Sequence, residues 1–297
     1  MSYLAHIQEC NAFDSQRFRP FMIDGKQAGW IRPEMALRLS AVHEVFSFED
    51  DQVRLSPVLA TSEARTEAVG KAMQALARQG AILQLRAELY PVVTDWGQAE
   101  LLRVDRAGVH ALGVLAVGVH LNGFVGRGAD MKLWIARRAR DKAVAPGKLD
   151  HLVAGGQPAG LGLTENLVKE CAEEADMPPM LARKAHSVGA IRYLFENEQG
   201  LRNDLIFCYD LECPPDFTPR PADGEVEAFE LWPVAKVQET VLNSRDFKFN
   251  VPLVLIDFMI RHGHITPENE PDYLALVRGL RGSYAISSEN SNFQAAR

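Results

Sequence analysis

The chain has 297 residues, a formal net charge of −7 and a hydrophobic fraction of 47%. This length suffices for one large core or two modest domains, and the acidic balance disfavours a general nucleic-acid-binding protein, which would usually be basic. The four cysteines form no C-x-x-C pair, which favours free thiols in a reducing compartment. With no apolar signal segment and no apolar run of bilayer length, the sequence predicts a cytoplasmic protein without a membrane partner.

Residues 1–108 are predicted to form a small α+β domain. The pair Asp24-Gly25 lies between two apolar runs, which is typical of a β-hairpin turn. Helices are expected from Pro33, which suits a first helical turn, and over residues 61–80. No pattern in this region indicates chemistry, so any catalytic site is expected further along the chain.

The pattern changes in residues 109–245, where Val- and Gly-rich segments predict several strands and one early helix, from about Thr164 to Ala175. Mixed strands with a single early helix favour an α+β domain over repeated βαβ units. Residues 246–297 are predicted to form a C-terminal helical extension packed on this domain, in which Asn250 is a candidate N-cap.

The early helix carries three glutamates within five residues, in the segment KECAEEADM. Glu170 and Glu174 are four residues apart and Glu173 is three from Glu170, so all three share one helix face. Like charges at this spacing destabilise a helix by roughly 0.2–0.5 kcal/mol per pair, and Lys169 is expected to pair with Glu165 instead of relieving the repulsion. A hard divalent cation would turn the repulsion into coordination, whereas the alternative is a solvated helix face.

A glycine-rich loop, in the segment AGGQPAGLGL, comes just before this helix. Glycines let backbone N–H groups approach an anion at a helix N-terminus. The segment contains neither the G-K-[ST] of a P-loop nor a G-x-G-x-x-G dinucleotide fingerprint. The loop and the glutamates together favour a metal site that binds a phosphate-containing substrate over a solvated helix face.

The two segments resemble the box of the Nudix hydrolases, G-x5-E-x7-R-E-U-x-E-E-x-G-U, in which U is a bulky apolar residue. The leading glycine and the later glutamates of the box fall on Gly155, Glu170, Glu173 and Glu174. Leu161, Lys169 and Asp176 stand where the family has Glu, Arg and Gly. We expect Asp176 to adopt the left-handed conformation that Gly supplies at a helix end, so the departures affect loop geometry more than metal binding.

The resemblance extends over most of the chain, through segments such as PGKLDHLVAGGQPAGL, FCYDLECPPDF and FKFNVPLVLIDFMIRHG. It is strongest to the Nudix branch related to the domain fused ahead of thiamine pyrophosphokinase in fungi. The resemblance implies an α/β/α Nudix sandwich with a mixed sheet, preceded by a smaller α+β domain. It also implies a Mg²⁺- or Mn²⁺-dependent hydrolase that cleaves the phosphoanhydride bond of a small organic diphosphate similar to thiamine diphosphate or its damaged analogues.

Glu170, Glu173 and Glu174 are the predicted metal ligands, and the resemblance adds the carbonyl of Gly155. One carboxylate must accept a proton from the attacking water. Its candidates, left open by the sequence, are Glu173, Glu225 and Glu227. The last two alternate with Val226, so they are expected to point to one side of a strand or loop.

The diphosphate also needs cationic partners. The basic segment WIARRARDKAVAPGKLD supplies them, and Arg138 and Lys148 are the predicted substrate-binding residues. The small-molecule diphosphate is the expected partner, and the N-terminal domain is a candidate cover for the pocket or a candidate homodimer contact.

Two other functions use a similar scaffold. An enzyme like isopentenyl-diphosphate isomerase needs a catalytic Cys and Glu in its pocket, but Cys171 is expected on the helix face away from the glutamates. A non-catalytic diphosphate-binding module would have no reason to keep the glutamate triplet. Both alternatives are therefore less favoured than a hydrolase.

Overall fold

The computed structural model describes residues 2–142 and 144–282. Within these ranges the chain forms two compact units, one of residues 2–11, 117–193 and 205–282 and the other of residues 12–116 and 194–204. The predicted domain boundaries after residues 108 and 245 stay a prediction.

The second unit contains small sheets and two longer helices. A four-stranded sheet has the order β2-β1-β4-β3, and β5 pairs with β6. The elements of this unit are β1 (Arg19–Ile23), β2 (Lys26–Ile31), α2 (Pro33–Ser40), β3 (Phe46–Glu49), β4 (Gln52–Leu55), α3 (Ser62–Arg78), β5 (Leu89–Val92), β6 (Leu102–Asp105) and α4 (Val109–Leu112). The predicted hairpin is confirmed, since β1 and β2 pair antiparallel and both Asp24 and Gly25 have positive φ, of 49° and 72°. The helix predicted over residues 61–80 is α3, and the hydroxyl of Thr61 caps it.

The first unit is built on a mixed sheet. Its path is β11-β12-β7-β8-β13, with β10 paired to β7 and β9 paired to β8. The strands are β7 (Leu115–Val125), β8 (Lys132–Arg138), β9 (Leu149–Asp150), β10 (Val153–Gly156), β11 (His186–Asn197), β12 (Gly200–Glu212) and β13 (Val226–Pro233). The short strand β10 leads directly into the glycine-rich loop.

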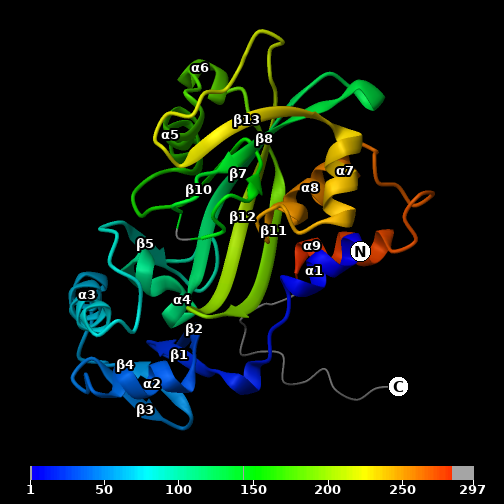
Figure 1. The fold of residues 1–297 in the computed structure, drawn as a ribbon. Helices are drawn as coiled ribbons and strands as arrows, with labels where there is room; N and C mark the ends of the chain where they lie inside the picture. Colours follow the sequence, from blue (N-terminus) through cyan, green and yellow to red (C-terminus); the bar gives the residue numbers. More distant parts are fainter. Residues whose placement is uncertain (1, 143, 283–297) are drawn as a thin grey trace. The chain divides into compact units, whose positions relative to one another are not determined.

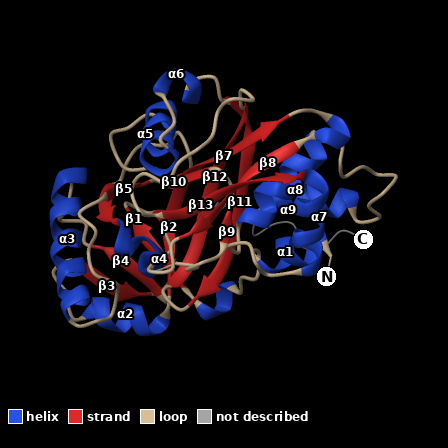
Figure 2. Cartoon of the chain, turned by 45° about the horizontal axis from the view of Figure 1, so that its top comes forward, coloured by secondary structure: helices blue, strands red, loops and turns tan. Residues whose placement is uncertain are grey.

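Helices cover both sides of this sheet (Figures 1 and 2). The helices are α1 (Tyr3–Glu9), α5 (Leu163–Ala175), α6 (Pro179–Ala182), α7 (Val234–Asn243), α8 (Val251–Arg261) and α9 (Tyr273–Arg281). On β7, Leu121 packs in one core with Leu167 and Cys171 of α5, whereas Phe124 contacts Phe258 of α8, with ring centroids 5.6 Å apart. The alternation of side chains along one strand thus supplies a core to each helical layer, and the predicted α/β/α arrangement with a mixed sheet is confirmed.

Two details of the helix ends differ from the sequence-based expectations. Helix α5 begins at Leu163 with Gly162, not Thr164, at the N-cap position. Asn250 occupies the N-cap position of α8, but its amide donates to the Tyr193 hydroxyl (3.0 Å) and makes no cap bond. In the described residues no helix is long and apolar enough to cross a membrane.

Candidate active site

Strand β10 and helix α5 bring Gly155 and Glu170 into contact. A Cβ placed on Gly155 would lie 2.2 Å from Cδ and 2.3 Å from Cγ of Glu170, which is far inside van der Waals contact. The strand holds Gly155 in place because it pairs with Val119 of β7. Only glycine therefore lets the Glu170 carboxylate lie directly against this backbone.

Glu174, one turn after Glu170, is buried at the same place, with 7% of its surface exposed. One carboxylate oxygen accepts a hydrogen bond from the backbone N–H of Ala154, at 3.0 Å. Burial raises the pKa of Glu174 well above its usual range; the Ala154 bond opposes this, and the charges of Asp150, Glu170 and Glu225 raise the pKa further. A buried carboxylate surrounded by other carboxylates is an environment that a cation would stabilise.

Glu173 is held by a different partner. Its carboxylate accepts from the ammonium of Lys169 at 2.7 Å, and the same ammonium lies 3.1 Å from Glu170. The expected pairing of Lys169 with Glu165 is wrong, because Glu165 instead accepts from the backbone N–H of Gly162 (2.9 Å) at the start of the helix. Lys169 thus partly neutralises the glutamate face.

A double-mutant cycle tests this reassignment. The coupling between Lys169→Gln and Glu173→Gln is expected to be about 0.3–0.5 kcal/mol in the free energy of unfolding of the metal-free protein, as for other exposed i,i+4 pairs. The matched cycle of Lys169→Gln with Glu165→Gln is expected to show coupling near zero. Urea denaturation of the single and double variants measures both, and a larger coupling in the second cycle would restore the original assignment.

The donor set fits a hard divalent cation. Glu170 and Glu174 supply carboxylate oxygens, and the main-chain carbonyl of Gly155 is the further predicted ligand. Among residues 2–142 and 144–282 no three His, Cys, Asp or Glu side chains gather closely enough to hold a metal ion by themselves. The carbonyl and substrate phosphate oxygens would therefore have to complete the coordination, which is the usual situation for Mg²⁺.

Comparison with known proteins shows the family of this chain. A family model described as a domain of unknown function (DUF4743) matches residues 2–116. The chain is 40% identical to Nudix hydrolase 20, chloroplastic, of Arabidopsis thaliana, covering 94% of this chain and 77% of the relative. Nudix hydrolase 24, chloroplastic, of the same plant is also 40% identical, with the same coverage. The chain belongs to the Nudix hydrolase family. Among solved structures, the Nudix domain of Shewanella oneidensis NrtR complexed with ADP-ribose aligns with 51% of this chain and 90% of its own, with 15% identity and a TM-score of 0.40.

This Nudix hydrolase braces its loop without the Glu and Arg of the family box. The side-chain amide of Gln157 donates to the carbonyl of Leu161 (2.7 Å), and that of Asn166 donates to the carbonyl of Gly156 (2.8 Å). Both amides are buried, with 2% and 0% of the residue exposed. The two hydrogen bonds span the loop from both ends. The sequence signal for this bracing is the pair of amide side chains, Gln157 within the glycine-rich segment and Asn166 just after it.

At the other end of the helix, Asp176 has φ 50° and ψ 36°, so the left-handed conformation predicted for this departure from the box is confirmed. Cys171 is fully buried in the core beneath the helix, where burial raises the pKa of its thiol. A thiol in that position lies away from the glutamate face, as expected.

The proton-acceptor candidates occupy different positions. Glu225 precedes β13 and forms an ion pair with Lys142, and its charge acts on Glu174. Glu227 lies at a register shift of β13, between Val226 and Ala228, and its carboxylate is 3.8 Å from Arg140. Only Glu227 is in the strand, and the strand is bulged there, so the expectation that both carboxylates point to one side of a strand or loop stays a prediction.

Asp150 is a buried carboxylate that sequence reasoning missed. It interacts with two cationic side chains near the glutamates. Arg138 donates to it at 3.0 Å and the ammonium of Lys248 lies 3.5 Å away. Burial alone would raise the pKa of Asp150, but Lys248, His151 and Arg138 outweigh it, and the pKa is lowered. Its signal was an acidic residue inside the apolar run KLDHLV. The backbone carbonyl of Lys148 accepts from Arg138 N–H, but its ammonium donates to the carbonyl of Arg245 at 2.7 Å.

Two histidines lie next to this cluster. His120 and His151 are buried, and their ring centroids are 4.5 Å apart. Burial lowers the pKa of both, to about 4 for His151, so the pair is neutral at pH 7 and leaves the charge of Asp150 to Arg138 and Lys248.

Proposed function

We propose that this Nudix hydrolase uses Mg²⁺ or Mn²⁺ to cleave the phosphoanhydride bond of a small organic diphosphate. The observation that carries the proposal is the buried Glu174 carboxylate, held by Ala154 and surrounded by other carboxylates, next to Glu170 on the backbone of Gly155. A divalent cation held by these carboxylates would neutralise their charge.

Each residue has a defined task in this proposal. Glu170 and Glu174 would hold the ion with the carbonyl of Gly155, and Glu173 adds charge at the rim of the site while Lys169 orients it. The bound ion would neutralise the diphosphate and lower the pKa of a water molecule. Arg138, one of the two predicted substrate-binding residues, would contact phosphate oxygens, with Asp150 holding it in place. Substrate binding by Lys148 stays a prediction, because its ammonium donates to the carbonyl of Arg245.

Glu225 is the favoured proton acceptor among the three candidates. The charge of Glu225 acts on the buried Glu174, whereas Glu173 is paired with Lys169 and the carboxylate of Glu227 lies 3.8 Å from Arg140. Its carboxylate forms an ion pair with Lys142, which holds it at the start of β13.

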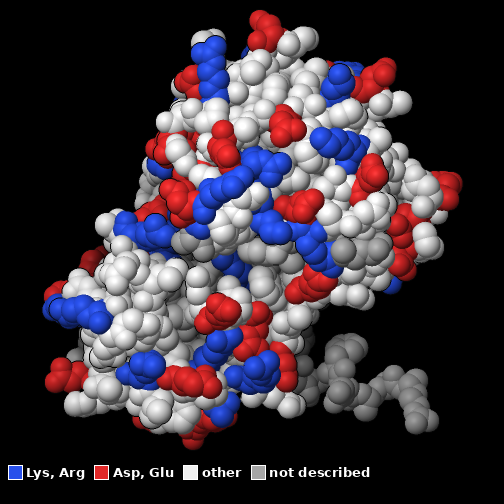
Figure 3. All heavy atoms as spheres, in the orientation of Figure 1, with Lys and Arg blue, Asp and Glu red and all other residues white. Residues whose placement is uncertain are grey.

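The finer substrate assignment comes from the sequence resemblance to the branch fused to thiamine pyrophosphokinase, which suggests thiamine diphosphate or its damaged analogues. We also propose a cytoplasmic protein whose partner is this small molecule and not a nucleic acid or a membrane, with a homodimer as its assembly. The net charge of −7 and the mixture of acidic and basic side chains on the face in Figure 3 support the absence of a nucleic-acid partner.

A substrate panel tests the proposal. The protein would be incubated with Mg²⁺ and thiamine diphosphate, its oxidised analogues, nucleoside diphosphates and isopentenyl diphosphate, and inorganic phosphate release would be measured. We expect phosphate from at least one thiamine-type diphosphate and none after chelation of the metal. Isomerised isopentenyl diphosphate without phosphate release would instead support the isomerase alternative, and binding without any reaction would support a non-catalytic module.

A further inference from the structure

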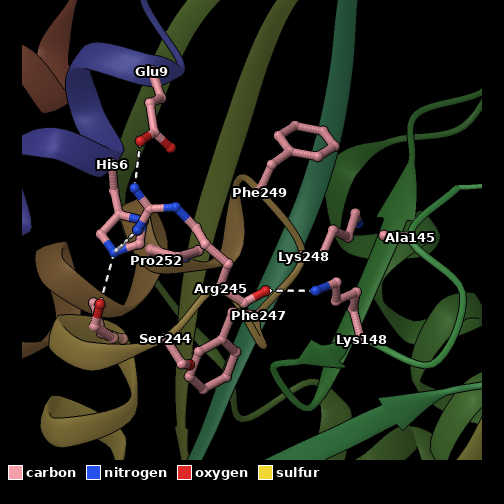
Figure 4. A pocket seen from close by; sticks show the side chains of 11 residues that line it. His6, Glu9, Ala145, Lys148, Ser244, Arg245, Phe247, Lys248, Phe249 and Pro252 are labelled. Carbon is pink, nitrogen blue, oxygen red and sulfur yellow. Dashed lines mark hydrogen bonds and ion pairs between the residues drawn. The ribbon is translucent and has the colours of Figure 1, made fainter. Parts of the chain in front are cut away.

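A cavity of about 260 Å³ opens in the first unit at some distance along the chain from the glutamates (Figure 4). Its walls come from α1, from the segment before β9 and from the connection between α7 and α8. Its charged and titratable lining residues are His6, Glu9, Lys148, Arg245 and Lys248.

The lining has an excess of positive charge. Lys148, Arg245 and Lys248 face one carboxylate, that of Glu9. Arg245 forms an ion pair with Glu9, but 41% and 56% of the two side chains are exposed, and pairs this exposed contribute little to stability. An incoming anion can therefore replace Glu9 as the partner of the guanidinium at small cost.

The other cations also keep donor capacity. The ammonium of Lys148 donates to the carbonyl of Arg245 (2.7 Å), and a lysine has three donors in all. His6 adds no charge, since burial lowers its pKa and its Nε2 lies 2.7 Å from the carbonyl of Val241. The ammonium of Lys248 is 3.5 Å from Asp150, and Arg138 also contacts Asp150. If Asp150 and Arg138 are counted with the lining, the net charge around the cavity is still positive.

Aromatic and apolar side chains complete the wall. Phe247 and Phe249 line the cavity together with Pro252 and Val241. The ring of Phe247 is fixed by an edge contact with Trp232, and that of Phe249 by an edge contact with Tyr193. Rings held in this way favour a flat ligand. Since a cavity of roughly 150 Å³ accommodates benzene, the volume here has room for one ring and a phosphate but not for a dinucleotide.

We propose that this cavity is a binding site for a small aromatic molecule that carries a phosphate group, with Arg245 and Lys148 contacting the phosphate and Phe247 the ring. The site goes beyond the proposed hydrolysis, because none of these residues is a proposed metal ligand and binding requires no metal. Such a molecule has two sources, the organic end of the diphosphate substrate or a separate regulatory ligand.

The test uses the full chain in EDTA with phenyl phosphate as the probe, followed by isothermal titration calorimetry. We expect phenyl phosphate to bind at least ten-fold more tightly than inorganic phosphate, and benzylamine not to bind. Arg245→Gln is expected to weaken binding ten-fold or more, whereas Glu9→Gln, which removes the competing carboxylate, is expected to tighten it several-fold. Arg127→Gln is the matched control, because Arg127 is also an exposed arginine paired with a glutamate (Glu212, 3.1 Å).

Equal affinity for phenyl and inorganic phosphate, or unchanged binding in both Arg245→Gln and Glu9→Gln, would overturn the inference. These binding measurements involve no metal and no turnover. Binding of phenyl phosphate can therefore be found even if the protein releases no phosphate from the substrate panel, and phosphate release can be found even if phenyl phosphate does not bind. With an active protein, competitive inhibition by phenyl phosphate would identify the site with the substrate's organic end. Non-competitive inhibition or activation, weakened by Arg245→Gln, would identify it as a separate ligand site.

Discussion

Replacing Glu174 by Gln is expected to lower kcat/KM for the diphosphate substrate on the order of 10³-fold, which corresponds to about 4 kcal/mol in transition-state free energy. The amide oxygen of Gln can still accept the Ala154 hydrogen bond, so the local structure should be kept while the charge that would hold the metal is lost. Steady-state kinetics with Mg²⁺, alongside calorimetric titration of Mn²⁺, would measure both effects. A variant with wild-type activity would sink the assignment of Glu174 as a metal ligand.

The same substitution should make the metal-free protein more stable at neutral pH. The pKa of Glu174 is raised on folding, so the folded state binds a proton more tightly than the unfolded state does. Stability contributed by this group is therefore lost as pH rises from the ordinary range of glutamate, about 4.3, through the raised pKa. The free energy of unfolding of Glu174→Gln minus that of wild type should grow with pH in EDTA, and saturating Mg²⁺ should reverse the order.

Replacing Gly155 by Ala is expected to reduce activity on the order of 10²-fold and to weaken Mn²⁺ binding ten-fold or more, since effects of this size follow when a metal ligand is displaced. The new Cβ would lie 2.2 Å from Cδ of Glu170, so the carboxylate must leave the backbone against which it packs. Calorimetric titration of Mn²⁺ and the phosphate-release assay check the two expectations.

Gly162→Ala is the matched control for this experiment, because a Cβ there meets only the end of the flexible Glu165 side chain, at 3.3 Å, and φ is −74°. The double variant Gly155→Ala with Glu170→Ala should regain the stability that Gly155→Ala loses, since the clash is gone, but not the activity. Full activity in Gly155→Ala would show that Glu170 does not act from its present position.

The local features of this protein were readable from the sequence because they depend on near neighbours in the chain. The turn at Asp24-Gly25, the cap of α3 by Thr61 and the left-handed Asp176 each follow from backbone preferences within a few residues. The glutamate face of α5 follows from helix periodicity, and the resemblance of its spacing to the Nudix box anticipated the family.

The local predictions that failed did so where several partners of similar energy compete. Lys169 can reach glutamates in both directions along the helix. It pairs with Glu173, whereas Glu165 accepts a hydrogen bond from the backbone N–H of Gly162. Periodicity also could not anticipate the bulge at Glu227, because a bulge depends on the pairing of β13 with β8.

By itself the sequence determined the fold class, the family and the presence of three glutamates on one face of helix α5. Only the tertiary structure decided that Glu170 lies on Gly155, that Asp150 gathers Arg138 and Lys248, and that residues from α1 to α8 enclose one cationic cavity. The physical reason is that burial and long-range charge contacts join residues far apart in the chain, and these set pKa values and cavity walls that no local pattern encodes.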